Sequence, residues 1–327
     1  MYAGIEGGGT RSTLIIVDNS GKVVAEAATS GLNYHLLGIQ KTVDAVAAVI
    51  HDCWPKEYPR KPLKALGLGL SGAKDGSTQN SQFVEQLMIK HPEVAEKVYI
   101  VSDTFHTFFY VIVFGGAVII SGTGSSCFLK IGDFECRCGG NGYLIGDKGS
   151  GIWIALRAIQ YIMNENSGWE TPPYNSLTLR SLMHSYFGIK DDNEILHYLH
   201  VSFSKPKIAG FCSELAKKIF SEAGVLLGHH LNTVMRNAEE HGKKTDCLQV
   251  IATGSVFNSW QLLKEGFVRG TKGASKSVNT KRIEIYSVNG TIAKGLAYMA
   301  AKNAKYNFFY DFDASKSYID TFDLQSE

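Results

Sequence analysis

Two stretches of this sequence share one pattern of strands and turns, and that pattern limits the fold more than any other feature. In 2–30, three apolar runs that favour strands (YAGIE, STLIIVD and VVAEAA) are joined by GGGTR and by a turn, NSGK. In 115–140, an apolar strand, a Gly-Thr-Gly turn, a second strand, a Gly-Asp turn and a third strand follow in the same order. Thr10 and Thr123 hold equivalent places, so the pattern predicts a duplicated architecture of two lobes.

The glycine-threonine turns are predicted to bind phosphate. Glycine reaches backbone angles that other residues avoid and leaves neighbouring N–H groups uncovered, and successive exposed amides form an anion-binding nest. Thr10 in the first turn, and Thr123, Gly124 and Ser125 in the second, would supply hydroxyls and amides to a nucleotide held between the lobes. The alternatives are plain hairpin turns or a chance pairing of two glycine turns. A P-loop is excluded because GxxxxGK[ST] does not occur, and a dinucleotide motif would lead into a helix rather than a strand.

The rest of the chain alternates helices and strands, which predicts a mainly parallel α/β sheet. Helices are expected at 36–54 and 81–91, and strands at 63–73 and 97–103. We expect a helix at 151–166, a long helical stretch at 209–240 that Gly210, Gly224 and Gly228 could break, and strand–turn–helix units at 247–267 and 282–303. The last 20 or so residues have no predicted element. The predicted lobes are 1–116 and 117–327.

Composition excludes several classes of protein. A net charge of +2, with 44% hydrophobic and 20% charged residues, is typical of a soluble globular protein and does not favour binding to nucleic acid or an anionic membrane. The apolar run 108–120 is shorter than the ~20 residues of a membrane span, and Gly115-Gly116 divides it. With no signal peptide pattern at the start, the six cysteines are expected to be reduced thiols in a cytosolic protein. Cys136 and Cys138 lack the second ligand pair that zinc requires.

A few carboxylates and turns stand where chemistry is expected. Ser71 and Asp103 end predicted strands, where ligands of such sheets bind, and Asp103 could accept the proton of an attacking hydroxyl in phosphoryl transfer or could cap a helix. Asp147, in GGNGYLIGDKGSGIW, either contacts a ligand or caps the helix that follows. Glu6 could hold Mg²⁺ through water, and Gly254 opens a turn suited to the adenosine side of a nucleotide.

Several motifs occur in the order seen in eukaryotic N-acetyl-D-glucosamine kinases. They are GIEGGGTRS, LGLSGA, SDTFHT, IISGTGSSC, CGGNGYLIGDKGSGIW, AGFC and TGSVFNSWQLLKEGF, and they run from about Ala3 to Phe267. The chain therefore resembles the BadF/BadG-type ATPases within the sugar kinase, actin and heat-shock ATPase superfamily. The resemblance implies an α/β, two-lobed, actin-like (duplicated ribonuclease H-like) fold, a cytosolic homodimer, and transfer of the γ-phosphate of Mg²⁺-bound ATP to the 6-hydroxyl of an amino sugar.

The resemblance also assigns residue roles. It makes Asp103 the general base. It matches sugar contacts to Asn33, Ser71, Gly140 and Asp147, and nucleotide contacts to Thr10, Thr123, Ala209 and Gly254.

This chain departs from the family pattern at positions around the predicted sugar pocket and nucleotide edge. Lys148 replaces a glutamate, Asn141 a tryptophan, Tyr34-His35 a His-Trp pair, and Asn258 a lysine. Tyr34, His35 and Asn141 are therefore candidate sugar contacts, and Asn258 a candidate nucleotide contact. The phosphate hairpins and Asp103 are unchanged. Two alternatives stay open: an ATPase that drives a partner reductase through a shared iron–sulfur cluster, and a sugar-binding protein without catalysis.

Overall fold

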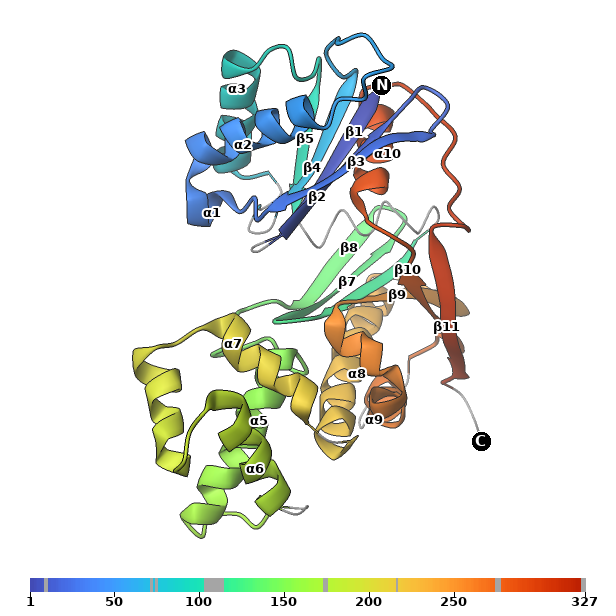
Figure 1. Cartoon of the computed structure of the whole chain (residues 1–327). Coiled ribbons are helices and arrows are strands. Elements are labelled where there is room, and N and C mark those ends of the chain that lie inside the picture. The colour runs from blue at the N-terminus through green and yellow to red at the C-terminus, as the bar shows by residue number, and fades with distance from the viewer. Residues whose placement is uncertain are drawn as a thin grey trace. The chain divides into compact units, whose positions relative to one another are not determined.

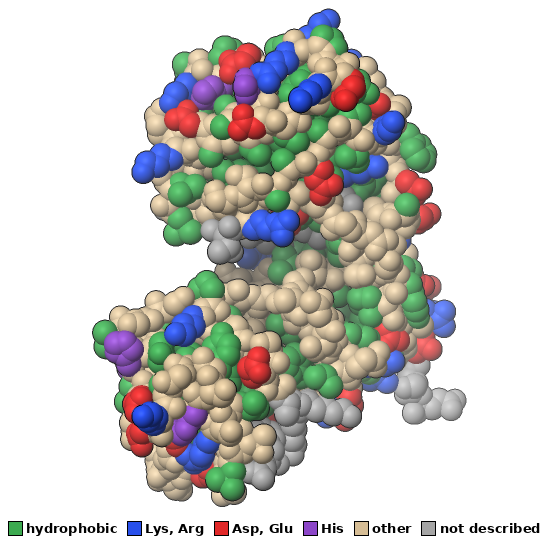
Figure 2. Space-filling model, viewed as in Figure 1, with side chains coloured by type: hydrophobic (Ala, Val, Ile, Leu, Met, Phe, Trp, Pro, Cys, Tyr) green, Lys and Arg blue, Asp and Glu red, His purple; other side chains and the backbone are tan. Residues whose placement is uncertain are grey.

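The chain divides into two compact units in a computed structural model (Figure 1). The structure describes residues 1–8, 11–70, 73, 76–102, 115–172, 176–215, 217–273 and 278–324, without the side chains of His35, Lys217 and Lys218. Unit 1 comprises Met1–Val113 and Val288–Ser317, and unit 2 comprises Phe114–Ser287 and Tyr318–Glu327. On the face shown in Figure 2, basic and acidic side chains are interspersed over each unit, in keeping with the net charge of +2.

Unit 1 is built on a five-stranded sheet of order β3-β2-β1-β4-β5. The first three strands form the predicted antiparallel meander, and β4 and β5 extend it as parallel strands. Their bounds are β1 Tyr2–Gly7, β2 Arg11–Val17, β3 Val23–Ser30, β4 Ala65–Leu70 and β5 Val98–Ser102.

Helices cover both faces of this sheet. Figure 1 shows α2 (Ile39–Asp52) and α3 (Thr78–Lys90) on one side and α10 (Ala293–Asn303) on the other, while a short α1 (Tyr34–Leu37) precedes α2. The buried face of α2 carries the apolar residues Val43, Val46, Ala47 and Ile50 at helical spacing, as the sequence predicted.

The helix α10 packs directly on β1 and β4 because glycines leave room for its backbone. A β-carbon on Gly4 would lie 1.8 Å from the carbonyl oxygen of Ala293, and one on Gly67 would lie 2.2 Å from that of Leu296. Because of this packing, the segment Val288–Ser317 belongs to unit 1. The division predicted from the sequence had placed that segment in the second lobe.

Unit 2 is built on a six-stranded sheet of order β11-β10-β9-β6-β7-β8. Read from β8 to β10, this order repeats that of unit 1, with three antiparallel meander strands followed by two parallel ones. The predicted duplication is therefore present in the sheet topology. The strands are β6 Gly116–Ser121, β7 Ser125–Ile131, β8 Phe134–Gly139, β9 Cys247–Thr253, β10 Arg282–Val288 and β11 Lys316–Asp323. Strand β11 is the C-terminal segment for which the sequence predicted no element.

The helices of unit 2 pack on this sheet and on one another. Their bounds are α5 Gly151–Asn166, α6 Ser176–Phe187, α7 Lys205–Gly210, α8 Lys217–Glu240 and α9 Trp260–Lys272, with short helical turns η1 Asp192–Glu194, η2 His197–Val201, η3 Phe211–Glu214 and η4 Ser255–Ser259. No helix of the described ranges is long and apolar enough to cross a membrane.

Helix α8 runs unbroken through Gly224 and Gly228, where the sequence had suggested breaks. Both glycines pack against α9: a β-carbon on either would lie 2.3 Å from a carbonyl oxygen of that helix. Gly266 and Gly270 of α9 meet α8 in the same way, at 1.9 and 2.1 Å. The glycines therefore serve close helix packing, and this packing overrides their low helix propensity.

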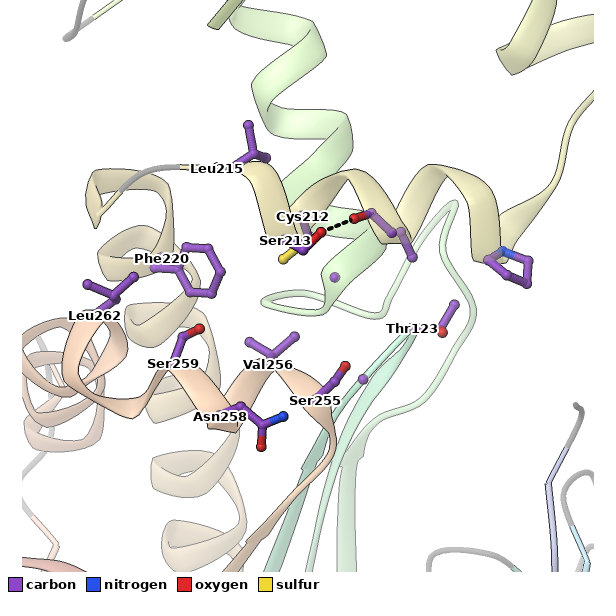
Figure 3. Close-up of a pocket in the computed structure, with 15 residues that line it drawn as sticks. Thr123, Cys212, Ser213, Leu215, Phe220, Ser255, Val256, Asn258, Ser259 and Leu262 are labelled. Atoms are coloured by element: carbon purple, nitrogen blue, oxygen red, sulfur yellow. Dashed lines mark hydrogen bonds between the residues drawn. The ribbon is translucent and has the colours of Figure 1, made fainter. Parts of the chain in front are cut away.

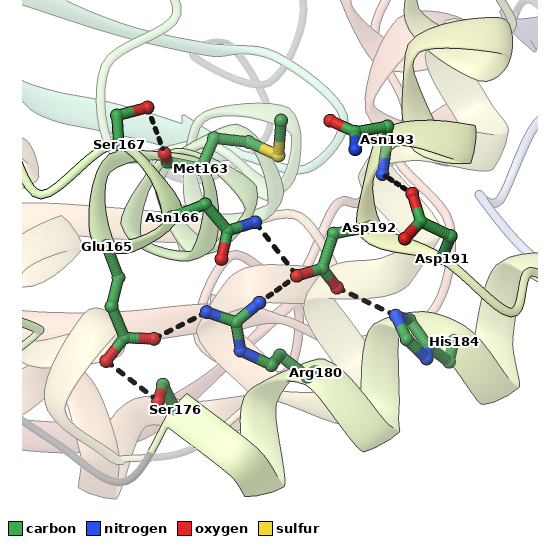
Figure 4. A network of polar contacts seen from close by, with 10 residues as sticks. All are labelled: Met163, Glu165, Asn166, Ser167, Ser176, Arg180, His184, Asp191, Asp192 and Asn193. Atoms are coloured by element: carbon green, nitrogen blue, oxygen red, sulfur yellow. Dashed lines mark hydrogen bonds and ion pairs between the residues drawn. The ribbon is translucent and has the colours of Figure 1, made fainter.

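A polar network ties α5, α6 and η1 together (Figure 4). Arg180 of α6 forms ion pairs with Glu165, at the end of α5, and with Asp192 of η1. Nε2 of His184 lies 2.8 Å from Oδ1 of Asp192. Asn166 donates a hydrogen bond to the same aspartate. The network fixes the end of α5 remote from its first residue, Gly151.

Candidate nucleotide-binding site

Unit 2 contains a cavity of about 510 Å³, a size typical of small-molecule sites. Five parts of the fold meet around it: the β6–β7 turn, the start of α5, α7 with η3, the start of α8, and η4 with α9. The lining residues are Gly122, Thr123, Gly151, Pro206, Ala209, Gly210, Cys212, Ser213, Leu215, Phe220, Ser255, Val256, Asn258, Ser259 and Leu262. Thr123, Ala209 and Asn258, predicted nucleotide contacts from three distant segments, therefore share one cavity.

The Gly-Thr-Gly turn between β6 and β7 is fastened to the start of α5. The amide of Gly122 donates to the carbonyl of Gly124 (3.0 Å), which closes the turn, and the amide of Gly151 donates to the carbonyl of Gly122 (2.8 Å). The hydroxyl of Ser121 donates to the carbonyl of Gly149 (2.9 Å). These bonds hold Thr123 at the cavity beside the N-terminus of α5, and a helix N-terminus favours anions.

The cavity has one polar and one apolar end (Figure 3). Thr123 and Ser255 lie at one end, while Leu215, Phe220 and Leu262 lie toward the other. The polar end, with its turn amides, suits phosphates, and the apolar end suits the flat face of a base. The Cys212 thiol belongs to the wall: burial raises its pKa to about 12, so it is protonated at neutral pH.

Asp147 is buried beside the phosphate turn and does not cap α5. That cap is Ser150, whose hydroxyl oxygen accepts a hydrogen bond from the amide of Trp153. The Asp147 carboxylate instead accepts from Nζ of Lys205 (2.9 Å) and from the amide of Ser125 (3.4 Å). It lies so near Gly124 that a β-carbon there would come within 2.8 Å of Oδ2.

The predicted sugar loop, residues 139–147, joins β8 to this aspartate. Gly139 and Gly140 have φ values of 82° and 74°, in the left-handed region that favours glycine. The amide of Gly140 donates to the carbonyl of Ser125 (2.9 Å), so the loop starts against the phosphate hairpin. Asn141 is exposed, and at the tip Leu144 and Ile145 expose their apolar side chains.

Three of the predicted site residues whose side chains the structure describes belong to unit 1. Asn33 accepts a hydrogen bond from the amide of Leu36 at the start of α1 (3.3 Å). Tyr34 is buried, and its hydroxyl donates to Oδ1 of Asn80 (2.8 Å). Glu6, on β1, accepts a hydrogen bond from the hydroxyl of Thr291 (2.9 Å).

The remaining predictions fall outside what the structure describes. They concern Thr10, Ser71 and Asp103, and the side chain of His35. Gly254 is described: it directly precedes η4, in contact with the backbone of the phosphate turn.

Comparison with known proteins gives the family. The BadF/BadG/BcrA/BcrD ATPase family matches residues 3–290, nearly the whole chain. The chain belongs to this ATPase family. The expected actin-like, duplicated α/β fold is confirmed, since the structure resembles a crystal structure from Chromobacterium violaceum assigned as an N-acetylglucosamine kinase, with a TM-score of 0.61 and 20% identity over 90% of this chain and 96% of that one.

Two relatives of this chain carry names that specify sugars. The glucosamine kinase GspK of Vibrio cholerae is 32% identical over 51% of this chain, and the aligned part is 56% of that protein. The N-acetylmuramic acid/N-acetylglucosamine kinase of Clostridium acetobutylicum is 23% identical over 91% of this chain and 97% of that one.

Sequence reasoning missed part of the candidate site. Lys205, the ion-pair partner of Asp147, lies in SFSKPK, a segment with no recognisable motif. The apolar wall was missed as well, because apolar residues such as Leu215, Phe220 and Leu262 cannot be told from ordinary core residues in the sequence.

Proposed function

We propose that this chain transfers the γ-phosphoryl group of ATP to the 6-hydroxyl of N-acetyl-D-glucosamine. The observation that carries the proposal is the cavity of unit 2, where Thr123, Ala209 and Asn258 line one space large enough for a nucleotide. The family is one of ATPases, and two of its relatives are named for amino-sugar kinase activity. The cytosol is the proposed compartment, and a homodimer the proposed assembly.

Phosphoryl transfer requires mainly positioning and charge neutralisation from the protein. In the proposed mechanism, the turn at Thr123 and the N-terminus of α5 hold the phosphates. Asp147 contributes to the sugar contacts. Asp103 accepts the proton of the 6-hydroxyl as that oxygen attacks phosphorus, and ADP leaves with the bond to its β-phosphate oxygen broken.

Magnesium is proposed to accompany ATP and to neutralise phosphate charge. Mg²⁺ keeps several waters and is commonly held by one or two carboxylates together with substrate phosphates. A single carboxylate such as Glu6 fits this donor set. The hydrogen bond from Thr291 to Oε2 orients that carboxylate.

The decisive variant is Asp103→Asn. Loss of the base is expected to lower kcat with N-acetylglucosamine about 10²- to 10⁴-fold, while the Kd for ADP stays unchanged. The exposed Asp52 provides a control, Asp52→Asn, which should keep full activity. Coupled ADP release gives the rates, and phosphorus NMR of the product identifies the phosphorylated hydroxyl. Equal turnover in Asp103→Asn and the unaltered chain would reject the proposed base.

A second candidate acceptor is N-acetylmuramic acid, the acid named in the Clostridium relative. Two cations at the sugar loop favour it. The guanidinium of Arg137 lies against Gly140, where a β-carbon would come within 2.0 Å of it, and Lys148 follows Asp147 in place of the glutamate of the resembled family. Within the described part of the chain, neither makes an ion pair with a carboxylate. A lactyl carboxylate would be attracted to both.

The comparison that tests this acceptor uses Lys148→Glu. If the cations select the acid, this variant should lose kcat/KM for N-acetylmuramic acid and keep it for N-acetylglucosamine. Equal effects on the two sugars would exclude a role of Lys148 in choosing between them.

A further inference from the structure

We propose that Lys205 is a positioning residue, which holds Asp147 in place and thereby couples the nucleotide cavity to the sugar loop. The inference rests on the proposed function, because it assumes that residues 139–147 contact the acceptor. Its observations all lie within unit 2.

The first observation is the ion pair. Nζ of Lys205 lies 2.9 Å from Oδ2 of Asp147, whose side chain is only 6% exposed. A buried carboxylate without a cationic partner is strongly disfavoured. This carboxylate also accepts a hydrogen bond from the amide of Ser125, but that bond is long at 3.4 Å, so Lys205 makes the stronger interaction.

The second observation is the backbone of Asp147, which has a φ of 50°. This left-handed conformation is uncommon for a residue with a side chain, and it persists only where surrounding contacts enforce it. The ion pair is one such contact. Removing it loosens the carboxylate and takes away one of the contacts that favour this backbone conformation at the end of the sugar loop.

The third observation is that Lys205 begins the helix that forms part of the wall of the nucleotide cavity. It is the first residue of α7, and Pro206, Ala209 and Gly210 of the same helix line the cavity. A ligand that contacts this wall therefore restrains the helix that carries Lys205.

A ring stack beside the ion pair strengthens the connection. Phe203, two residues before Lys205, stacks on Tyr143 of the sugar loop with centroids 5.0 Å apart, and Nζ of Lys205 lies 5.9 Å from the centroid of the Tyr143 ring. Residues 203–205 thus contact the loop at both Tyr143 and Asp147. Nucleotide and sugar are accordingly expected to bind with positive coupling, since ordering α7 by one ligand orders the loop for the other.

The alternative role for Lys205 is that of a phosphate ligand. The two roles predict different losses. A positioning residue affects sugar affinity even without nucleotide and acts only through Asp147, whereas a phosphate ligand affects ADP affinity and acts independently of Asp147.

The test compares Lys205→Met, Lys205→Arg, Asp147→Asn and the double variant Lys205→Met/Asp147→Asn. Lys207→Met is the matched control, because Lys207 lies on the same helix over the ring of Tyr198. Lys205→Met should weaken sugar binding, measured by calorimetry without nucleotide, about 10- to 100-fold, in line with the cost of a misplaced binding group. Lys205→Arg should recover most of this loss, and Lys207→Met should show none.

Comparing the kcat/KM losses of the single and double variants gives a more specific test than sugar affinity alone. If Lys205 acts through Asp147, the double variant should lose no more kcat/KM for the sugar than Asp147→Asn alone. Additive losses would overturn the proposal, as would a fall in ADP affinity with unchanged sugar affinity.

A measurement without sugar separates this inference from the proposed function. ADP should slow amide hydrogen exchange in residues 139–147 of the unaltered chain and not in Lys205→Met. Should no sugar be phosphorylated, the proposed function fails while this exchange result still decides the coupling. Equal ADP protection in both proteins would overturn the role of Lys205.

Discussion

Gly254 lies so close to Ser121 that a β-carbon on it would stand 2.3 Å from the carbonyl oxygen of Ser121. The two residues belong to different strand ends, after β9 and at the end of β6, and their contact brings η4 against the phosphate turn. The φ of Gly254 is 100°, which adds a second requirement for glycine. The shape of the polar end of the cavity therefore depends on this position.

Gly254→Ala is expected to weaken nucleotide binding strongly. The added methyl group must push η4 away from the β6–β7 turn. The backbone of Gly254 (φ 100°, ψ 154°) also lies in a region that is nearly restricted to glycine, at a further cost of ~1–3 kcal/mol. The Kd for ADP, measured by calorimetry, should rise more than tenfold. Gly242→Ala is the control, since Gly242 has a φ of 74° with open space around its Cα. If both variants bind ADP as the unaltered chain does, the close approach is unimportant for the cavity.

Filling the cavity should separate binding from folding. Ser255 is exposed and lines the cavity, so Ser255→Trp would occupy nucleotide space without disturbing the core. ADP affinity should fall more than tenfold while Tm changes little, because surface substitutions typically alter stability by no more than about 0.5 kcal/mol. Gln261→Trp, on an exposed position of α9 outside the cavity lining, should leave ADP affinity intact. Undiminished ADP binding by Ser255→Trp would place the nucleotide elsewhere.

The fold was largely predictable where local patterns decide it. The meanders that begin at Tyr2 and Gly116 are marked by apolar runs separated by glycine turns, and the structure contains both. Tertiary packing decided the rest. Gly224 and Gly228 weaken a helix locally, yet α8 continues through them because α9 packs on those glycines.

Long-range pairing explains the other differences. The helix α10 was predictable from the sequence, but the sheet on which it packs was not. It packs against Gly4 and Gly67, which are more than 200 residues away in the chain. Strand β11 lies at the edge of its sheet, with a mixture of exposed and half-buried residues that gives a weak strand signal.

The candidate site shows the same limit. The phosphate turn at Thr123 was predictable from its glycines, and Ala209 and Asn258 were matched through the family resemblance. Lys205 was not, because its ion pair reaches Asp147 across 58 positions of sequence, and a lone lysine at the start of a short helix has no pattern of its own.

The network around Arg180 should contribute to stability and not to nucleotide binding. Arg180→Met removes the cation between Glu165 and Asp192 and leaves the mostly buried Asp192 with His184 and Asn166. Thermal unfolding should shift down by about 2–6 °C, the size expected for one or two lost interactions in a domain of this length. The Kd for ADP should stay within about twofold of the original, an experimental margin that corresponds to less than 0.5 kcal/mol. A large loss of ADP affinity would show that the far end of α5 controls the cavity.

The buried His230 should make stability depend on pH. Its ring lies against Gly139, and within the described part of the chain its Nδ1 has no hydrogen-bond partner. Burial, with the nearby charges of Lys148 and His229, lowers the pKa of His230 from 6.5 to about 4. In the unfolded chain this histidine takes up a proton near pH 6.5, whereas in the folded chain it stays neutral down to about pH 4. Its contribution to the free energy of unfolding is therefore complete above pH 6.5 and is lost as the pH falls toward 4.

Urea unfolding at pH 7.5 and pH 5 measures this effect. From the two pKa values, His230 should account for about 2 kcal/mol of the stability lost between these pH values. His230→Gln cannot take up the proton, so its loss over the same interval should be smaller by that amount, even though carboxylates titrate in both proteins. His229→Gln, at the exposed neighbouring position, removes only a smaller contribution to this pKa than burial makes, so it should retain most of the dependence. An identical pH dependence in His230→Gln and the unaltered chain would mean that His230 is not held neutral by its surroundings.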